Sequence, residues 1–178
     1  MSDRDELLMA IRERAVIRGP VTLSSGQRAD WYVDLRRILL DGSAAPLAGR
    51  VMLATTAGLS YDAVGGLTLG ADPVATAMLH AAAAQGGRLD AFVVRKEEKA
   101  HGLQRRIEGP DVAGRRVLAV EDTSTTGSSV LTAVDALLEA GADVVGVAVL
   151  VERGARDAIT ARGLPYYAAF ELSDLGVG

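Results

Sequence analysis

The chain has 178 residues, of which 49% are hydrophobic, 4% are aromatic and none is cysteine, and its formal net charge is −4 at pH 7. These values predict a single globular domain over residues 1–178, and the lack of cysteine excludes a disulfide, a cysteine nucleophile and a thiolate-bound zinc site. The negative charge and the few aromatic residues argue against a nucleic-acid partner, and no apolar run approaches the roughly 20 residues of a membrane span, so we expect a cytoplasmic protein that binds small molecules.

The N-terminal segment predicts a helix followed by two strands. Apolar residues recur with helical spacing through residues 3–18, and a Gly-Pro pair would then end the helix. Residues 21–23 and 31–35 predict strands on either side of a polar turn. We expect residues 1–40 to form a small N-terminal subdomain, in which the two aromatic residues of the second strand either cover a flat ligand or pack into the core.

From residue 43 onward, helix and strand patterns alternate. The predicted helices cover residues 43–59, 73–84, 129–140 and 155–162, and the predicted strands cover 63–67, 91–94, 117–120, 144–151 and 166–170. This alternation predicts an α/β protein with a doubly wound, mostly parallel sheet and helices on both of its faces. Polar clusters follow the first four of these strands, at residues 68–72, 95–99, 121–127 and 152–154. Ligands bind at the carboxyl ends of the strands in such sheets, so all four clusters would lie along the ligand edge.

The strongest functional signal is the stretch VLAVEDTSTTGSSV at residues 117–130. A buried strand would end in Glu121 and Asp122, and a loop of hydroxyl side chains would then open a helix capped by a serine. Backbone N–H groups, hydroxyls and the helix dipole favour a phosphate there, whereas the two carboxylates would repel it and should face a diol or a divalent cation. The pattern predicts a ribose 5-phosphate site rather than an ordinary strand-to-helix turn. The loop and helix residues expected around the phosphate are Thr123, Ser124, Thr125, Thr126, Gly127, Ser128 and Ser129.

The other polar clusters have an ordinary interpretation beside a functional one. Residues 68–72 either bind a second anion or form a tight turn that needs the backbone freedom of Gly70. Residues 95–102, RKEEKAHG, would by themselves be a solvated loop. Their place at the ligand edge favours contact with a diphosphate instead, because a diphosphate needs cations and residues 121–127, the acid loop, contain none. Arg153 is either a structural arginine or a guanidinium that contacts a carboxylate or carbonyl groups.

The acid loop resembles the phosphoribosyl pyrophosphate motif of the type I phosphoribosyltransferases. Residues 95–102 also resemble the mobile loop Arg-Lys-x-x-Lys-x-His-Gly of the orotate phosphoribosyltransferases within that family. The resemblance implies the type I fold, with residues 1–40 forming a hood over the site. It also implies transfer of a 5-phosphoribosyl group from phosphoribosyl pyrophosphate to orotate, which gives orotidine 5′-monophosphate and pyrophosphate in pyrimidine synthesis. A purine or uracil phosphoribosyltransferase and a phosphoribosyl pyrophosphate-sensing regulator are the alternatives.

The resemblance further implies a role for each matching residue. Residues 68–72 would bind pyrophosphate, and Ser24 stands where many bacterial members have a lysine. Mg²⁺ would enter with the substrate, without a dedicated set of protein ligands, and residues 95–110 of a homodimer would serve the partner's site. The catalytic residues would be Lys99, His101 and Asp122. The donor would be bound by Arg95, Lys96, Lys99, His101, Glu121, Asp122 and residues 123–129, and orotate by Thr125 and Arg153.

Overall fold

The computed structural model describes residues 1–22, 26, 28–96 and 106–177. Its helical segments are α1 (Asp3–Ala10), the π-helical η1 (Ile11–Ala15), α2 (Arg36–Leu39), α3 (Ala44–Thr55), α4 (Ala71–Ala84), α5 (Ser128–Glu139), α6 (Arg156–Thr160) and the 3-10 helix η2 (Leu172–Leu175). Its strands are β1 (Val16–Thr22), β2 (Arg28–Val33), β3 (Ala63–Leu67), β4 (Asp90–Val94), β5 (Ile107–Glu108), β6 (Arg116–Ser124), β7 (Asp143–Glu152) and β8 (Tyr166–Glu171). Lys99, His101 and Ser24 lie outside the described residues.

The main sheet has six strands in the order β5-β4-β3-β6-β7-β8. All neighbouring pairs are parallel except β4 and β5, which are antiparallel. The chain places β4 on one side of β3 and then crosses back to place β6 on the other side. The prediction of a doubly wound, mostly parallel sheet is therefore confirmed, and the loops after β3 and β6 meet at the point where the winding direction changes, which is where such sheets bind ligands.

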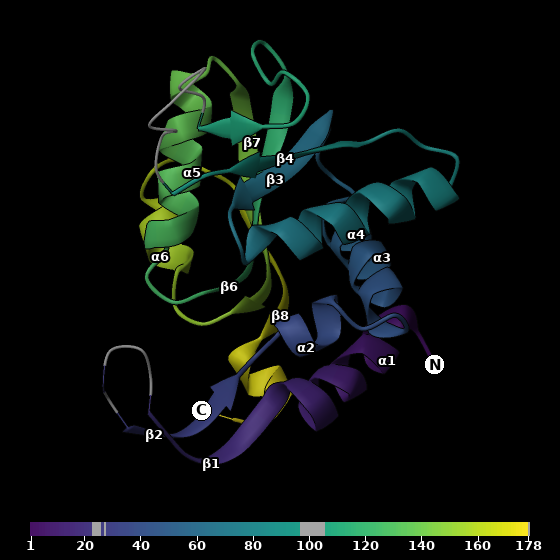
Figure 1. Cartoon of the computed structure of the whole chain (residues 1–178), viewed down its shortest axis with the longest axis vertical. Coiled ribbons are helices and arrows are strands. Elements are labelled where there is room, and N and C mark those ends of the chain that lie inside the picture. The colour runs from purple at the N-terminus through teal and green to yellow at the C-terminus, as the bar shows by residue number, and fades with distance from the viewer. Residues whose placement is uncertain (23–25, 27, 97–105, 178) are drawn as a thin grey trace.

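Helices cover both faces of this sheet, with α3 and α4 on one side and α5 and α6 on the other (Figure 1). Each face has its own hydrophobic core, and β6 contributes to both. Leu118 and Val120 belong to the core under α3 and α4, whereas Val117 and Ala119 belong to the core under α5. Successive side chains of a strand point to opposite faces, so a strand buried on both sides has the uninterrupted apolar sequence seen here.

The N-terminal hairpin lies outside the main sheet, where β1 and β2 form a separate antiparallel pair (Figure 1). The predicted helix over residues 3–18 was too long, because Val16 already pairs with Val33 in this hairpin. Strand β2 also begins and ends earlier than predicted, and Leu35 instead precedes the short helix α2, which the sequence reading missed. Pairing between distant residues therefore overrides the helical spacing that continues past Ala15.

Three arginines, one each in α1, η1 and β1, attach the N-terminal subdomain to the last strand and the segment that follows it. Arg4 Nη2 donates to the carbonyl of Ala169 at 2.8 Å, Arg12 Nε to that of Asp174 at 2.7 Å and Arg18 Nη2 to that of Gly176 at 3.3 Å. These bonds fix the N-terminal subdomain against the C-terminal part of the chain.

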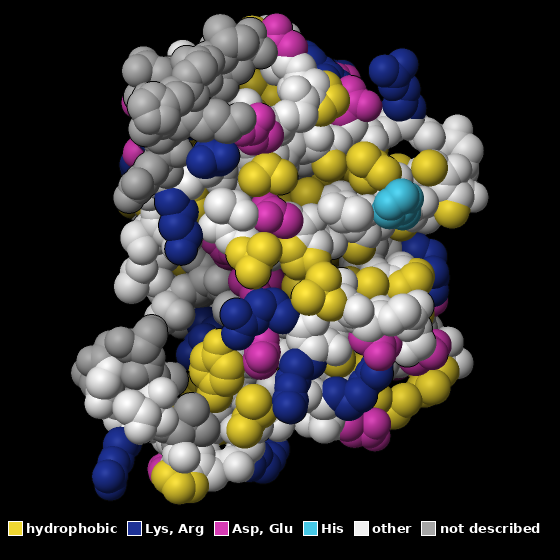
Figure 2. Space-filling view, in the orientation of Figure 1, with side chains coloured by type: hydrophobic (Ala, Val, Ile, Leu, Met, Phe, Trp, Pro, Cys, Tyr) yellow, Lys and Arg dark blue, Asp and Glu magenta, His cyan; other side chains and the backbone are white. Residues whose placement is uncertain are grey.

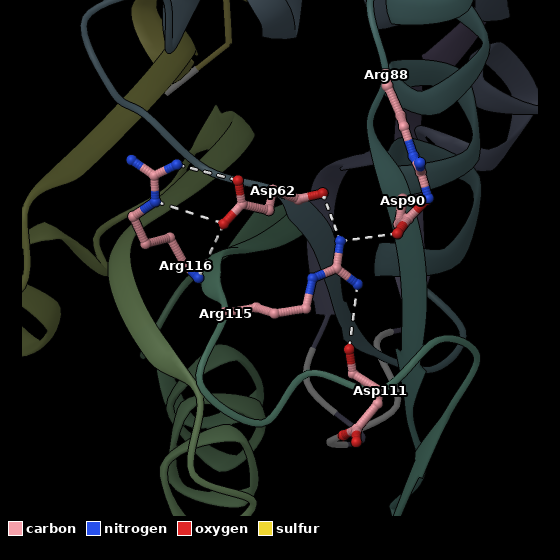
Figure 3. Close-up of polar contacts among 6 residues, drawn as sticks. All are labelled: Asp62, Arg88, Asp90, Asp111, Arg115 and Arg116. Atoms are coloured by element: carbon pink, nitrogen blue, oxygen red, sulfur yellow. Dashed lines mark hydrogen bonds and ion pairs between the residues drawn. The ribbon is translucent and has the colours of Figure 1, made fainter.

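A network of ion pairs holds the strands together at their amino ends, opposite the ligand edge (Figure 3). Arg115 Nη2 lies 2.7 Å from Oδ2 of Asp90 and donates to the carbonyl of Asp62 at 3.1 Å. The neighbouring Arg116 forms an ion pair with Oδ1 of Asp62 at 3.0 Å. The starts of β3, β4 and β6 are thus tied to one another, which fixes the relative positions of the strands whose carboxyl ends form the site.

Other element boundaries differ from the predictions in ways that affect the site. Strand β6 continues through Ser124 because β7 runs beside it to Glu152, so the two acids lie inside the strand rather than after it. Strand β5, which no predicted element covers, follows the cation-rich segment and pairs with β4. The predicted helix over residues 43–59 is also shorter, since α3 ends at Thr55. No helix within the described ranges is both long and apolar enough to cross a membrane.

Candidate functional site

The loop that follows β3 passes against the carboxyl-terminal part of β6 at Gly70. A Cβ atom at this position would lie 2.3 Å from Oε1 of Glu121 and 2.9 Å from Oδ1 of Asp122, both closer than real Cβ contacts allow. The φ angle of Gly70 is −62°, which any residue adopts, so the alternative in which a tight turn needs the backbone freedom of Gly70 is wrong. Glycine is required instead because the loop passes directly against the two carboxylates. The peptide bond between Thr68 and Leu69 in this loop is cis.

Burial and mutual repulsion raise the pKa values of the two acids. Only 5% of the Glu121 surface is exposed, and desolvation, followed by the charge of Asp122, raises the pKa of its carboxyl to about 8. Desolvation also raises the pKa of Asp122, although a 2.6 Å hydrogen bond from the N–H of Thr123 opposes that shift. The pair is therefore costly to ionise fully, and a cation or a group that donates hydrogen bonds would stabilise it.

The positive charge of Arg36 in α2 acts on this acid pair. It lowers the pKa of Asp122, whereas the negative charge of Asp34 raises it. The Arg36 side chain is held by an ion pair of 2.8 Å with Asp34 and by a 3.5 Å hydrogen bond to the hydroxyl of Tyr32. Sequence reasoning missed Arg36 as a site residue. The sequence shows only an arginine pair, residues 36–37, directly after the second predicted strand, and such a pair does not by itself indicate a site.

Two buried polar atoms near the acids have no hydrogen-bond partner among the described residues. Oδ2 of Asp72 accepts a hydrogen bond from the hydroxyl of Thr68 at 2.7 Å, but Oδ1 of the same side chain is unpartnered. The hydroxyl of Thr123 is the second such atom. Buried polar atoms are nearly always paired in folded proteins, so both atoms are available to a ligand at the switch point.

The hydroxyl loop lies at the N-terminus of α5, as predicted. Thr125, Thr126, Ser128 and Ser129 are exposed, and the hydroxyls of Thr126 and Ser128 lie 3.0 Å apart. The predicted serine cap was wrong, because α5 is preceded by Gly127 with a left-handed φ of +79° and without a side-chain cap. The N–H of Ser128 donates to the hydroxyl of Thr126 at 3.3 Å, and several exposed hydroxyls gather at the N-terminus of this helix, an arrangement suited to a phosphate.

The second predicted subsite lies beside this loop. The backbone N–H of Arg153 donates to the carbonyl of Ser124 at 3.1 Å, and a Cβ on Gly154 would lie 3.2 Å from the carbonyl of Thr125. The Arg153 guanidinium carbon lies 5.5 Å from the ring centroid of Trp31, which β2 supplies. No acid among the described residues forms an ion pair with Arg153. The structure thus brings Thr125, Arg153 and an aromatic ring of the N-terminal subdomain together.

The predicted cation loop is described only at its two ends. Arg95 follows β4, donates its backbone N–H to the carbonyl of Arg106 at 2.7 Å and forms an ion pair with Glu108 at 3.6 Å. Lys96 is exposed. Lys99 and His101 lie outside the described residues, so their roles stay predictions. Within the described part of the chain, no group of three or more acidic or histidine side chains could by itself hold a metal ion.

The chain matches the model of the phosphoribosyl transferase domain family over residues 48–160. It is 66% identical to the orotate phosphoribosyltransferase of Streptomyces avermitilis, over 98% of this chain and 97% of that relative. The crystal structure of Mycobacterium tuberculosis orotate phosphoribosyltransferase in complex with Fe(III) dicitrate has a TM-score of 0.91 and 57% identity, covering 99% of this chain and 100% of that one. The structure of the same enzyme in complex with 5-phospho-α-D-ribosyl 1-diphosphate has a TM-score of 0.87 and 52% identity over the same shares.

Proposed function

Because this chain belongs to the orotate phosphoribosyltransferases of the phosphoribosyltransferase family, we propose that its site transfers a 5-phosphoribosyl group from phosphoribosyl pyrophosphate to orotate. The products are orotidine 5′-monophosphate and pyrophosphate, and the enzyme is a pentosyltransferase of pyrimidine synthesis. One observation carries the proposal: the sheet brings an acid pair with raised pKa values, a hydroxyl-rich helix N-terminus and Arg153 to the same edge, at its switch point.

The donor would be held at the end of β6. Its 5-phosphate would accept hydrogen bonds from the N–H groups and hydroxyls at the start of α5. Its ribose hydroxyls would donate to Glu121 and Asp122, whose negative charge also stabilises the positive charge that develops at carbon 1 as pyrophosphate leaves. The relative in complex with 5-phospho-α-D-ribosyl 1-diphosphate supports the identity of the donor.

The departing diphosphate would lie toward the loop after β3 and the cations of residues 95–102. Mg²⁺ fits this side of the site, because the unpartnered Oδ1 of Asp72 is a carboxylate oxygen of the kind that Mg²⁺ prefers. When bound, the ion supplies positive charge to the diphosphate. Since the protein alone offers no complete ligand set within the described residues, most of its ligands would come from the donor itself.

The acceptor would lie between Arg153 and the hood. A planar guanidinium binds a carboxylate or a pair of carbonyl oxygens in a fixed orientation, and orotate carries both kinds of group. The ring of Trp31 would cover one side of a flat pyrimidine, and the exposed Thr125 would add a hydroxyl. No covalent nucleophile is needed, because the ring nitrogen of orotate attacks carbon 1 directly.

An apolar groove supports the proposal of a homodimer. It has a volume of about 790 Å³, lies between α2, α3 and α4, and borders the loop after β3 through Leu69. Leu40 and Leu69 are 74% and 62% exposed, and hydrophobic side chains gather on this side of the molecule (Figure 2). Exposed apolar surface of this kind favours burial by a partner. A second copy in the groove would lie next to the pyrophosphate side of the site, where the partner's residues 95–110 could act.

The decisive experiment measures pyrophosphate release from phosphoribosyl pyrophosphate with orotate, hypoxanthine, adenine or uracil as the acceptor. We expect release with orotate alone. Release with a purine or uracil but not with orotate would favour the other phosphoribosyltransferases, and donor binding without any turnover would favour a regulator. The cytoplasmic location stays a prediction.

A further inference from the structure

A second buried carboxylate, Glu152, lies at the ligand edge and has no part in the chemistry described above. It ends β7 directly before Arg153, and 6% of its surface is exposed. Its Oε1 accepts hydrogen bonds from the backbone N–H groups of Gly154 and Arg156, the latter at 3.4 Å, and its Oε2 accepts one from the hydroxyl of Tyr166. Both carboxylate oxygens of the buried Glu152 thus have hydrogen-bond donors, one from the turn that follows β7 and one from β8.

Tyr166 is itself held in place by α6. The guanidinium carbon of Arg156 lies 5.1 Å from the centroid of the Tyr166 ring, and the same guanidinium forms a 2.6 Å ion pair with Glu171. Burial and the hydrogen bond to Glu152 raise the pKa of the Tyr166 phenol, so the hydroxyl keeps its proton and remains a donor. The carboxylate of Glu152 is therefore fixed by two backbone N–H groups and by one side-chain hydroxyl.

The turn that Glu152 holds is connected to both subsites. The backbone N–H of Arg153 donates to the carbonyl of Ser124 at the end of β6, directly before the hydroxyl residues that would bind the donor. The guanidinium of Arg153 faces Trp31 of the hood. The backbone of this turn sets the direction in which the Arg153 side chain leaves the sheet. A change of a few degrees in that backbone would move the end of a long guanidinium side chain by a substantial fraction of a hydrogen-bond length.

We propose that Glu152, held by the hydroxyl of Tyr166, is a positioning residue that directs the Arg153 guanidinium toward the bound acceptor. The inference rests on the proposed function, in which Arg153 contacts the carboxylate or carbonyl groups of orotate. Neither Glu152 nor Tyr166 contacts substrate. Their effect should fall mainly on the acceptor, because the carboxylate binds the N–H groups that follow Arg153, whereas the phosphate-binding residues depend on the end of β6 and on α5.

The test uses two tyrosine variants that each remove one hydroxyl. Tyr166→Phe deletes the bond to Glu152 and keeps the ring that packs against Arg156. The matched control is Tyr61→Phe, because Tyr61 is also half-buried and bonds to the hydroxyl of Thr56 at 2.7 Å, but precedes β3 at the opposite edge of the sheet. Kinetic constants for both substrates are measured, together with the fluorescence of Trp31, the single tryptophan of the chain.

We expect Tyr166→Phe to raise the KM for orotate by about threefold to tenfold, the size expected for losing one hydrogen bond in a positioning network. The KM for phosphoribosyl pyrophosphate should stay within about twofold. The emission of Trp31 in the ligand-free enzyme should shift toward that of Arg153→Met, which lacks the guanidinium. Tyr61→Phe should change none of these quantities. Glu152→Gln, which keeps an oxygen for the backbone N–H groups, should retain more orotate affinity than Glu152→Ala.

The proposal is overturned if Tyr166→Phe lowers thermal stability but leaves both the orotate KM and the Trp31 emission unchanged, or if it raises the two KM values equally. A wild-type enzyme that fails to use orotate would instead refute the proposed function. The fluorescence comparison needs no substrate, so it still decides whether Tyr166 controls the position of Arg153. Tyr166→Phe removes a single hydroxyl, so it still tests the proposal if Glu152→Ala does not fold.

Discussion

Replacing Gly70 by alanine is expected to displace the two carboxylates of the site without straining the backbone. The φ angle of −62° at Gly70 suits alanine. The added Cβ would lie 2.3 Å from Oε1 of Glu121, whereas ordinary contact begins at 3.4 Å, so this oxygen has to move by about 1 Å. Asp122 is also approached, at 2.9 Å. The substitution therefore misplaces the groups that would hold the ribose.

A misplacement of about 1 Å can lower turnover by roughly 100-fold, so we expect a loss of that size in kcat, together with a higher KM for phosphoribosyl pyrophosphate. Stability should change little, because the contacted atoms are the ends of side chains that can turn aside. Overpacking at the low end of its range costs about 1 kcal/mol, which lowers the Tm of a chain of this size by about 2–4 °C. Steady-state kinetics and thermal unfolding measure the two effects separately.

Gly58→Ala is the matched control, because no heavy atom lies within 4 Å of its Cβ position and its φ is not left-handed. It should leave kcat, KM and Tm unchanged. If Gly70→Ala turns over orotate at a rate close to that of the unchanged enzyme, the acid pair does not need its observed position. The assignment of Glu121 and Asp122 to the ribose would then be refuted.

Four further predictions concern the charged groups of the molecule. Because the pKa of Glu121 is about 8, its carboxyl holds a proton near pH 7, and donor binding to the ionised form should release that proton. Calorimetry in two buffers with different ionisation enthalpies measures the release, and proton uptake would contradict the prediction. Because this pKa is raised above the unfolded value of 4.5, stability should fall as pH rises from 4.5 through 8, and Glu121→Gln should flatten that slope in urea titrations. Arg115→Ala, which removes the 2.7 Å contact with Asp90, should lower the free energy of unfolding by about 1–2 kcal/mol without changing kcat, whereas an equal loss of activity would implicate the network in catalysis. Lys99→Ala should reduce kcat far more than it weakens binding of the donor. Mixing this variant with Asp122→Asn should restore about a quarter of wild-type activity if the two subunits of a dimer share their sites. No recovery would show that each subunit is self-sufficient.

Most of the sheet could be predicted because its strands carry local signals. The apolar runs of β3 and β7 are bounded by turn residues, and the structure confirms both strands within a residue at each end. Elements that depend on a distant partner could not be predicted in this way. Val16 leaves a helical pattern because it pairs with β2, and β5 is a two-residue strand that exists because β4 lies beside it.

The same distinction applies to the site. The acid pair and the hydroxyl loop are contiguous in sequence, so their chemistry could be predicted together, and the structure places them at one strand end. The influence of Arg36 and the close approach of Gly70 depend on which loops the winding of the sheet brings together. Neither is visible in a local pattern. The buried Glu152 was also missed, because a carboxylate at the end of an apolar strand is indistinguishable in sequence from a solvated one.

The three hydrogen bonds from N-terminal arginines to C-terminal carbonyl groups affect the order in which the parts of the site form during synthesis of the chain. Each joins residues that are 158 to 165 positions apart in the chain. During synthesis the hood therefore emerges first but gains its support last, after residues 169–176 have left the ribosome. Until then, these bonds cannot help to hold Trp31 beside Arg153. A nascent chain would thus acquire its donor loop early and its acceptor pocket only near completion, which keeps a half-made enzyme from using orotate.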